Sequence, residues 1–226
     1  MGVSPVQDHR TDHLLEESLT RMAGIDTDTF AHIRRMNDGR FPTEVACILP
    51  GEFFVSREPM VVYTVLGSCI SACIRDPIAG IGGMNHFMLP APKEHQSGDA
   101  WGGESTRYGS FAMEQLINEI LKRGGMKHRL EVKLFGAGRI YDGNIDVGAR
   151  NTEWVLQYLK TEGYTLAKSD LGDVFPRKVY YFTDSGRVLM KKLERVKNRT
   201  IVDRETEYQH RIEVEPIAQE SNVTLF

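Results

Sequence analysis

The chain has 226 residues, enough for one large domain or two small ones, and its 41% hydrophobic and 26% charged residues predict a globular protein with a sizeable core. Lys and Arg number 28 against 31 Asp and Glu, a net charge of −3, which argues against a strongly basic nucleic-acid-binding protein. No apolar run approaches the roughly 20 residues of a membrane-spanning helix. The N-terminus also lacks the apolar segment of a secretory signal. We therefore expect a cytoplasmic protein without membrane insertion.

The first 43 residues are rich in charged side chains and contain one weakly amphipathic stretch, over residues 14–22. We expect them to form a flexible extension. From residue 45 the sequence becomes apolar and β-branched, with Gly and Pro between the apolar runs. This pattern predicts buried strands within 45–56, 61–67, 70–75 and 80–90, and Pro77 marks a turn between the last two.

The second half alternates helical and strand patterns. An apolar stripe from Tyr108 to Leu121 predicts a helix, capped by Ser105 or Thr106 and ended by two glycines at 124–125. The pattern continues with a strand over 129–138, a helix over 146–162 and a hairpin over 179–193 that turns at 184–186. After residue 194 the chain is again highly charged. We therefore predict a folded domain over 44–195, between an N-terminal extension (1–43) and a charged C-terminal extension (196–226).

Three cysteines, Cys47, Cys69 and Cys73, are an odd and small number, which argues against a disulfide framework and fits a reducing compartment. Cys69 follows a predicted strand and a glycine, so the backbone N–H groups of a tight turn could converge beside it and bind an oxyanion. His86 stands near the end of another predicted strand. If the two strands are neighbours, the imidazole would meet the thiol and convert part of it to thiolate near neutral pH.

Other interpretations of these residues, and of the glycines near them, each predict a recognisable sequence pattern. A single Cys and His in one sequence are more often core residues than a catalytic pair. Cys69, Cys73 and His86 would make only a partial metal site, because no fourth ligand stands at motif spacing. The paired glycines at 82–83 and 102–103 lack the Lys-Ser/Thr of a phosphate loop, and the Gly-Ala-Gly at 136–138 lacks the spacing of a dinucleotide loop. We expect neither a metal nor a cofactor.

Two segments together resemble the CheD family of chemoreceptor glutamine deamidases. They are TVLGSCISACIRDP (64–77) and GIGGMNHFMLP (80–90), which carry the LGSC, the DP turn and the GG-x-x-H-x-MLP pattern of that family. The resemblance covers about residues 52–193. Further matching segments are Arg107-Tyr108, KLFGAG (133–138), VGARN (147–151), and Asp170 followed by Arg177-Lys-Val. The GAG at 136–138 departs from the usual GGA.

The resemblance implies an α+β fold, in which mixed β-sheets pack as a sandwich with helices outside, as in the catalytic domain of cytotoxic necrotizing factor toxins. It also implies that Cys69 is the nucleophile, that His86 is the acid and base, and that no cofactor is needed. The backbone near Ser68 and Cys69 would hold the oxyanion. The family's third polar group is a threonine upstream of LGSC. Some members carry it where this chain has Tyr63, so Thr64, Tyr63 or a backbone carbonyl could take the role.

The activity implied is hydrolysis of selected glutamine side chains on methyl-accepting chemotaxis receptors, with release of ammonia through a cysteine thioester. Arg107 and Tyr108 could line an open cleft for the receptor's helical bundle, together with the Gly-rich loop 97–104. The alternative function is that of an adaptor, since family members can bind a CheC-type phosphatase. An intact Cys69 and His86 favour the enzyme.

Overall fold

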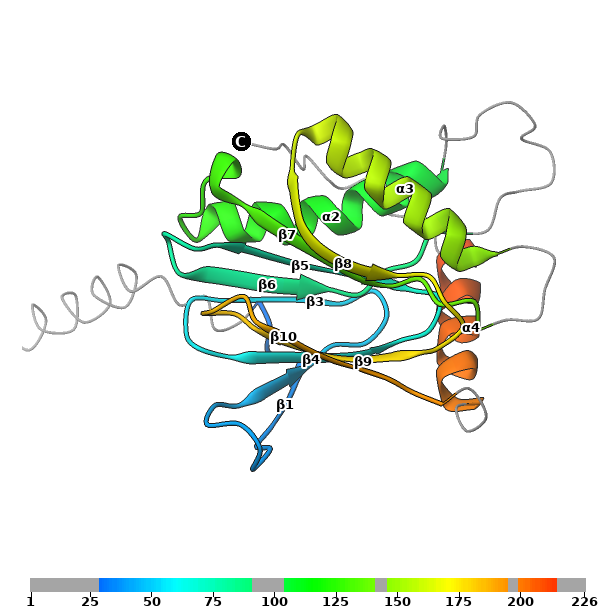
Figure 1. The fold of residues 1–226 in the computed structure, drawn as a ribbon, viewed down its shortest axis with the longest axis horizontal. Helices are drawn as coiled ribbons and strands as arrows, with labels where there is room; N and C mark the ends of the chain where they lie inside the picture. The colour runs from blue at the N-terminus through cyan, green and yellow to red at the C-terminus, as the bar shows by residue number, and fades with distance from the viewer. Residues whose placement is uncertain (1–28, 91–103, 141–145, 195–198, 215–226) are drawn as a thin grey trace, which may run out of the picture. The chain divides into compact units, whose positions relative to one another are not determined.

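Two five-stranded mixed β-sheets, with helices around them, lie within residues 33–226, the larger of two units into which the chain divides, the other being residues 1–32. This computed structural model describes residues 29–90, 104–140, 146–194 and 199–214 (Figure 1). The amphipathic stretch 14–22 and all but the last residue of the loop 97–104 lie outside the described residues. The expected combination of helices with mixed sheets is confirmed.

Sheet A has the strand order β1-β2-β4-β9-β10, and sheet B has the order β3-β6-β5-β7-β8. Neighbouring strands are antiparallel except for β2–β4 and β7–β8, which are parallel. The strands of sheet A are β1 (Arg34–Met36), β2 (Val45–Cys47), β4 (Val61–Leu66), β9 (Arg177–Phe182) and β10 (Val188–Lys192). Those of sheet B are β3 (Phe53–Ser56), β5 (Ile70–Asp76), β6 (Ile81–Asn85), β7 (Glu131–Gly136) and β8 (Thr165–Leu171).

Helices α2 (Glu104–Lys122) and α3 (Val147–Glu162) cover the outer face of sheet B, where α2 packs on β3, β5 and β6, and α3 packs on β5 and β8 (Figure 1). A short 3₁₀ turn, Lys127–Arg129, precedes β7. The predicted end of α3 at Gly163 is confirmed, since that residue has the left-handed φ of 73°. The cap prediction for α2 is wrong, because the helix already begins at Glu104 and includes Ser105 and Thr106.

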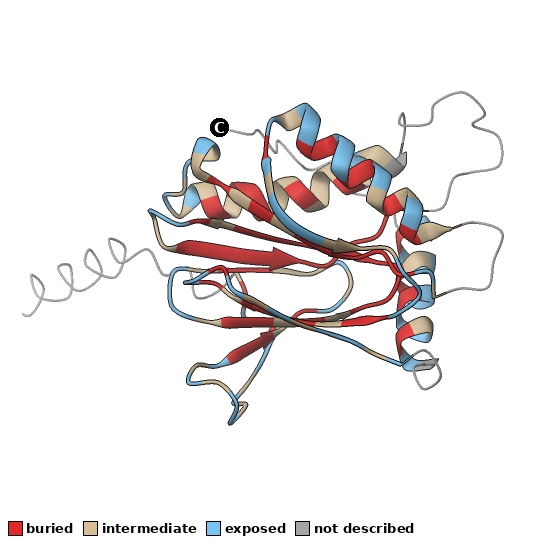
Figure 2. Cartoon of the chain, in the orientation of Figure 1, coloured by how far each residue is buried: buried red, intermediate tan, exposed pale blue. Residues whose placement is uncertain are grey.

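The central strands of sheet B form the most buried part of the fold, as Figure 2 shows for β5 and β6. Their near-continuous burial explains why these segments are apolar without alternation. The glycines at 82 and 83 serve packing here. A Cβ at Gly83 would lie 2.6 Å from the carbonyl oxygen of Phe54 on the neighbouring strand. The sequence analysis rejected a phosphate loop at this pair, and the close approach gives the physical reason for the two glycines.

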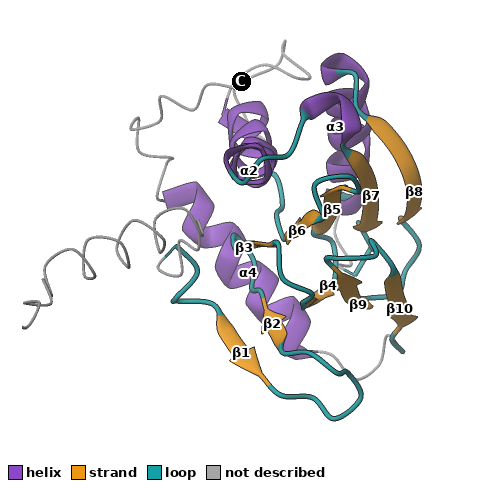
Figure 3. Cartoon of the chain, turned by 90° about the vertical axis from the view of Figure 1, so that its left-hand side faces the viewer, coloured by secondary structure: helices purple, strands orange, loops and turns teal. Residues whose placement is uncertain are grey.

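Helix α4 (Arg199–Val214) lies across the ends of the strands of both sheets, as the two perpendicular views agree (Figures 1 and 3). It falls within the charged segment 196–226, for which the sequence analysis predicted no helix. Similarly, β1 falls within the segment 1–43 and pairs with β2. In the part of the chain that the structure describes, no helix is long and apolar enough to cross a membrane.

The predicted turn after β5 is organised by the fully buried carboxylate of Asp76. Its Oδ1 accepts from the backbone N–H groups of Ile78 and Ala79 at 2.9 and 3.0 Å. Its Oδ2 accepts from the N–H of Met126 at 2.9 Å and pairs with the Arg129 guanidinium at 2.6 Å. Burial alone would raise the pKa of Asp76, but these hydrogen bonds outweigh it and hold the pKa below its usual range.

Asp76→Asn is expected to lower the free energy of unfolding by about 3 kcal/mol at pH 7. The substitution leaves the guanidinium of Arg129 without its carboxylate partner in a buried position. A group whose pKa is lowered by folding stabilises the fold above its unfolded pKa, and that contribution is lost as the pH falls through the folded pKa. The difference between the two proteins should therefore shrink in acid. Urea unfolding at pH 7 and at pH 3 measures it, with the exposed Asp184→Asn as control. An Asp76→Asn protein as stable as the control would contradict this account.

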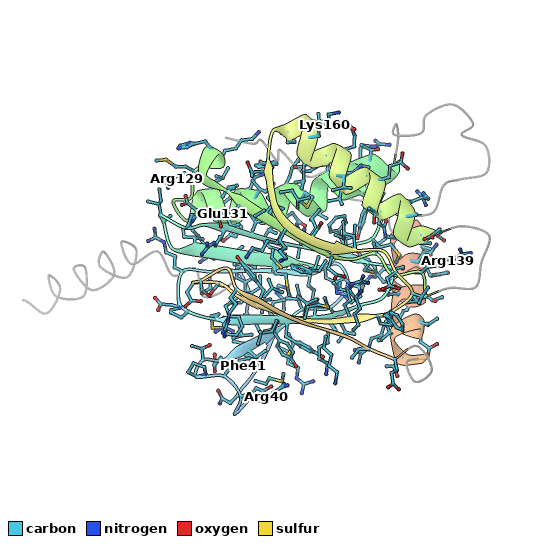
Figure 4. The ribbon with its side chains drawn as sticks, in the orientation of Figure 1. Arg40, Phe41, Arg129, Glu131, Arg139 and Lys160 are labelled. Atoms are coloured by element: carbon cyan, nitrogen blue, oxygen red, sulfur yellow. The ribbon has the colours of Figure 1, made fainter. Side chains whose placement is uncertain are left out.

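The start of β7 places further charged side chains beside this turn. Arg129 and Glu131 lie close together there in Figure 4, and Glu131 accepts from Arg75 Nε at 2.9 Å. On the outer side of sheet A, Arg40 and Phe41 project from the loop between β1 and β2 (Figure 4). Arg40 donates to the hydroxyl of Tyr180 at 2.9 Å, and Phe41 packs against the same ring at 5.2 Å between centroids.

Candidate active site

Cys69 lies in a three-residue turn, 67–69, that joins β4 of sheet A to β5 of sheet B. The segment 136–138 holds this turn from the side: Ala137 N donates to Cys69 O and Gly138 N donates to Gly67 O, both at 2.7 Å. Gly136 has a φ of 115° and passes directly against the carbonyl of Cys69, where a side chain has no room. The Gly-Ala-Gly segment therefore positions the cysteine turn. Ala137 has a left-handed φ of 59°, a conformation that glycine adopts without strain.

Asn151 on α3 also fixes this turn. Its Nδ2 donates to Ser68 O at 2.9 Å, and its Oδ1 accepts from Leu89 N at 3.0 Å. The side chain is completely buried, so both hydrogen bonds are shielded from water. Asn151 thus ties the cysteine turn to the segment that follows His86. In the sequence Asn151 is part of the matching VGARN segment, which predicts no role for it.

His86 directly follows β6 and is brought to Cys69 by strand pairing. β5 and β6 are antiparallel neighbours, and their pairing continues in a bridge between Ile70 and Phe87, the residues next to Cys69 and His86. Further backbone hydrogen bonds join His86 to the loop before β3, with His86 N donating to Glu52 O at 3.0 Å and Gly51 N donating to His86 O at 2.7 Å. The expected pairing of the strand before Cys69 with the strand before His86 is wrong, because β4 lies in sheet A and β6 in sheet B. The strand that follows Cys69, β5, is the neighbour of β6 and brings the two residues together.

Thr64 of β4 orients the imidazole. Its Oγ1 lies 2.7 Å from His86 Nδ1 and 2.8 Å from the carbonyl oxygen of Ile48. Since a hydroxyl has one proton and the carbonyl can only accept, the Thr64 proton points to Ile48 and the oxygen accepts from Nδ1–H. The lone pair of neutral His86 is therefore on Nε2, which is buried and has no hydrogen-bond partner among the described residues.

Tyr63 lies on the other face of sheet A. Its ring stacks on Tyr180 with 4.8 Å between centroids, and it packs against the cluster of Val45, Val61 and Tyr180. Strand alternation therefore presents Thr64 and not Tyr63 to the imidazole.

We expect Thr64→Val to lower turnover about 10- to 100-fold while Tyr63→Phe leaves it near wild type, because only the first change removes the group that fixes the His86 tautomer. Both substitutions keep the shape of the side chain. Glutamine deamidation by the two purified variants measures the effect. Equal rates for Thr64→Val and wild type would show that the backbone alone orients His86.

Glu205 of α4 completes the site, and its role is not predicted from the sequence. One carboxylate oxygen accepts from the N–H groups of Gly67 at 2.7 Å and Cys69 at 3.2 Å. The other oxygen accepts from Ser68 N at 2.8 Å and Ser68 Oγ at 2.7 Å. These are the backbone donors near Ser68 and Cys69 that the resemblance assigned to the oxyanion. They converge on one spot, and here that spot holds a carboxylate that is only 1% exposed.

The site is closed at the nucleophile. Cys69 is 0% exposed and His86 is 2% exposed. Burial, together with the charge and hydrogen bonding of Glu205, raises the pKa of the Cys69 thiol well above its usual value. Burial lowers the pKa of His86 to about 3. Both shifts favour the neutral thiol and the neutral imidazole over the thiolate–imidazolium pair.

Cys69, His86 and Glu205 are also the only group of metal-type donors that the described residues bring together, with one donor atom from each within 4.8 Å of the others. A zinc site with three protein ligands has this composition. However, both Glu205 oxygens already accept two hydrogen bonds each from the cysteine turn, which accounts for the carboxylate without a cation. Cys73 of the metal alternative lies on β5 opposite Met84, outside this group.

Two further residues were expected to line the substrate cleft. Arg107 is exposed in the first turn of α2. Tyr108 is half-buried, and its hydroxyl is 2.6 Å from that of Tyr208 on α4. The start of α2 therefore lies beside α4.

A thiol, an imidazole held by a hydroxyl and several convergent N–H donors are the parts of a cysteine-dependent acyl-transfer site. Comparison with known proteins identifies the family. Residues 88–192 match the family model described as CheD chemotactic sensory transduction. The chain belongs to the CheD family.

Its relatives are named probable chemoreceptor glutamine deamidases CheD. The protein from Halorhodospira halophila is 50% identical over 200 residues, which is 87% of this chain and 91% of the relative. Those from Methylobacillus flagellatus and Herminiimonas arsenicoxydans are 47% and 48% identical, over 81% and 80% of this chain and 91% and 89% of the relatives.

Proposed function

We propose that this chain is a chemoreceptor glutamine deamidase, which hydrolyses selected glutamine side chains of methyl-accepting chemotaxis receptors to glutamate and releases ammonia. The observation that carries the proposal is the convergence of the Gly67, Ser68 and Cys69 N–H groups beside a cysteine whose neighbouring His86 is oriented by Thr64. The names of the relatives supply the substrate class.

The reaction follows from the positions of these groups. His86 Nε2 takes the thiol proton of Cys69, and the thiolate attacks the Cδ of the substrate glutamine. The N–H groups of the cysteine turn hold the oxyanion that forms. His86 then gives its proton to the departing ammonia, leaving a thioester on Cys69. His86 next takes a proton from water, which attacks the thioester and releases glutamate and the free thiol.

Other residues hold the reacting groups in position. Thr64 keeps the Nε2 lone pair of His86 toward the reacting atoms. Asn151 and the segment 136–138 keep the N–H groups of the turn aimed at one point. No step of this scheme requires a cofactor.

The partner is the helical bundle of the receptor in the cytoplasm, with Arg107 and Tyr108 at the edge of the binding surface. From the family resemblance we infer that the two sheets and the helices outside them have the sandwich arrangement of the cytotoxic necrotizing factor catalytic domain. The adaptor function, with a CheC-type phosphatase as partner, remains the second candidate on family grounds. We place catalysis first because the Cys69, His86 and Thr64 groups are all in place.

The domain that carries this activity spans 44–195, with the C-terminal segment as an attached regulator.

Mass spectrometry of receptor peptides incubated with and without the protein tests the function. Each deamidated glutamine gains about one dalton as NH₂ is replaced by OH. Gains at defined glutamines that depend on the protein support the proposal. Peptides that stay unchanged while the protein binds a CheC-type phosphatase would favour the adaptor.

A further inference from the structure

Glu205 has an unusual place on its helix. The buried positions of α4 are Ile201, Glu205, Tyr208 and Ile212, which fall on one helical face. An ionisable side chain in the middle of such a face is costly to bury unless it is fully hydrogen-bonded. Glu205 meets this condition only through the cysteine turn, because its carboxylate accepts from three backbone N–H groups and one hydroxyl there. The face of α4 is therefore built to fit the catalytic site.

The carboxylate of Glu205 is also the chemical group that glutamine deamidation produces. It lies within 4.8 Å of the Cys69 thiol and of the imidazole, on the donors that would hold the oxyanion. It is carried by a helix, as the glutamines of a receptor bundle are. We propose that α4 is a tethered product analogue, which occupies the substrate surface through Glu205 and must leave before a receptor helix can bind. This inference rests on the proposed function and names how its site is regulated.

The contacts of α4 outside the carboxylate define the surface that a receptor helix would use. The hydroxyl of Tyr208 meets that of Tyr108 on α2, and Arg211 donates to Pro50 O at 3.1 Å. A cavity between α4 and residues 49–52 leaves part of this contact unfilled. An element held by few apolar side chains beside an unfilled space separates more readily than the sheets beneath it. The surface for the receptor helix thus comprises residues 49–52, the cysteine turn and the start of α2.

The same geometry makes residue 205 a potential substrate. With glutamine at 205, Cys69 would attack its Cδ, ammonia would leave with a proton from His86, and water would hydrolyse the thioester to a carboxylate and the free thiol. The net reaction is glutamine plus water to glutamate plus ammonia, the reaction proposed for the receptor. Glu205→Gln should therefore revert to glutamate by the protein's own action.

The test compares three full-length proteins by peptide mass: Glu205→Gln, Glu205→Gln with Cys69→Ala, and the matched control Glu207→Gln, whose side chain is exposed two residues along the same helix. We expect glutamate at 205 in the first, and unchanged glutamine in the second and third. A Glu205→Gln protein that keeps its glutamine while it deamidates receptor peptides would overturn the tethered-product inference and leave the proposed function standing. Conversion at 205 without receptor deamidation would support the inference and refute the receptor as substrate, and conversion of neither would refute both.

A second pair of variants tests release of α4 without changing the carboxylate. Ile212→Ala removes a buried apolar contact of α4, and Val214→Ala is its exposed control. If α4 blocks the site, Ile212→Ala should raise both receptor deamidation and the rate of Cys69 alkylation by iodoacetamide several-fold, while Val214→Ala leaves both unchanged. A lower deamidation rate in Ile212→Ala would instead mean that α4 supports catalysis, and would overturn the inference.

Discussion

Cys69→Ala should abolish deamidation, with a loss of about 10⁴-fold or more in kcat, because no other described side chain can form the thioester at the point where the N–H groups converge. The substitution removes one sulfur from a turn that is held by backbone hydrogen bonds to Ala137 and Gly138, so the fold should persist. Ammonia release from receptor peptides measures the activity, and thermal unfolding measures the fold.

The matched control for this variant is Cys73→Ala. Cys73 is equally buried, but it lies within β5, where it pairs with Met84 and Lys133 in the strands on either side. Its loss should cost about 1 kcal/mol in packing and leave kcat unchanged. Wild-type turnover in Cys69→Ala, or an equal loss in both variants, would remove Cys69 from the role of nucleophile.

The sequence predicts the centre of this site well, because the residues that form it are close in the chain or joined by neighbouring strands. Cys69 precedes β5 and His86 follows β6, and antiparallel pairing of these two strands brings the start of one beside the end of the other. The choice between Thr64 and Tyr63 could not be made from the sequence, since alternation says that the two point to opposite faces but not which face holds the imidazole. The packing of sheet A decides it, by placing Tyr63 against Tyr180.

Helix α4 and β8 were missed for different physical reasons. The strand β8 is half-exposed at the edge of sheet B, so its sequence TLAKSDL lacks an apolar pattern. In α4, Ile201, Tyr208 and Ile212 have helical spacing, but the charged residues around them are typical of a solvated tail. The signal that could have indicated a function is Glu205, a charged residue on the same helical face as these three apolar positions. Its partners are more than 130 residues away in the chain, on a turn whose backbone N–H groups donate to its carboxylate.

The position of Glu205 also links the fold to the state of the catalytic groups. While the carboxylate is docked, it helps to raise the pKa of Cys69, and the burial of the site lowers the pKa of His86. Both shifts disfavour the thiolate–imidazolium pair. Departure of α4 would admit water and remove the negative charge, so the same movement that exposes the site would also favour formation of the nucleophile.

His86→Asn should lower kcat by roughly 10²- to 10⁴-fold, the usual contribution of a group that moves protons in the transition state. Asparagine keeps a polar side chain within reach of Thr64, so the hydrogen bond that Thr64 accepts from His86 Nδ1 has a substitute. It has no lone pair basic enough to take the thiol proton. The loss should therefore appear in kcat, with the KM for receptor peptides nearly unchanged.

A second readout separates a proton-transfer role from a structural one. If Nε2 of His86 takes the thiol proton, His86→Asn should also slow the alkylation of Cys69 by iodoacetamide at neutral pH, and the difference should vanish at a pH high enough to ionise the thiol without help. Residues packed only for structure would not produce this pH dependence. Alkylation rates that match wild type at every pH would show that the thiol and imidazole are not coupled, and His86 would then be a core residue.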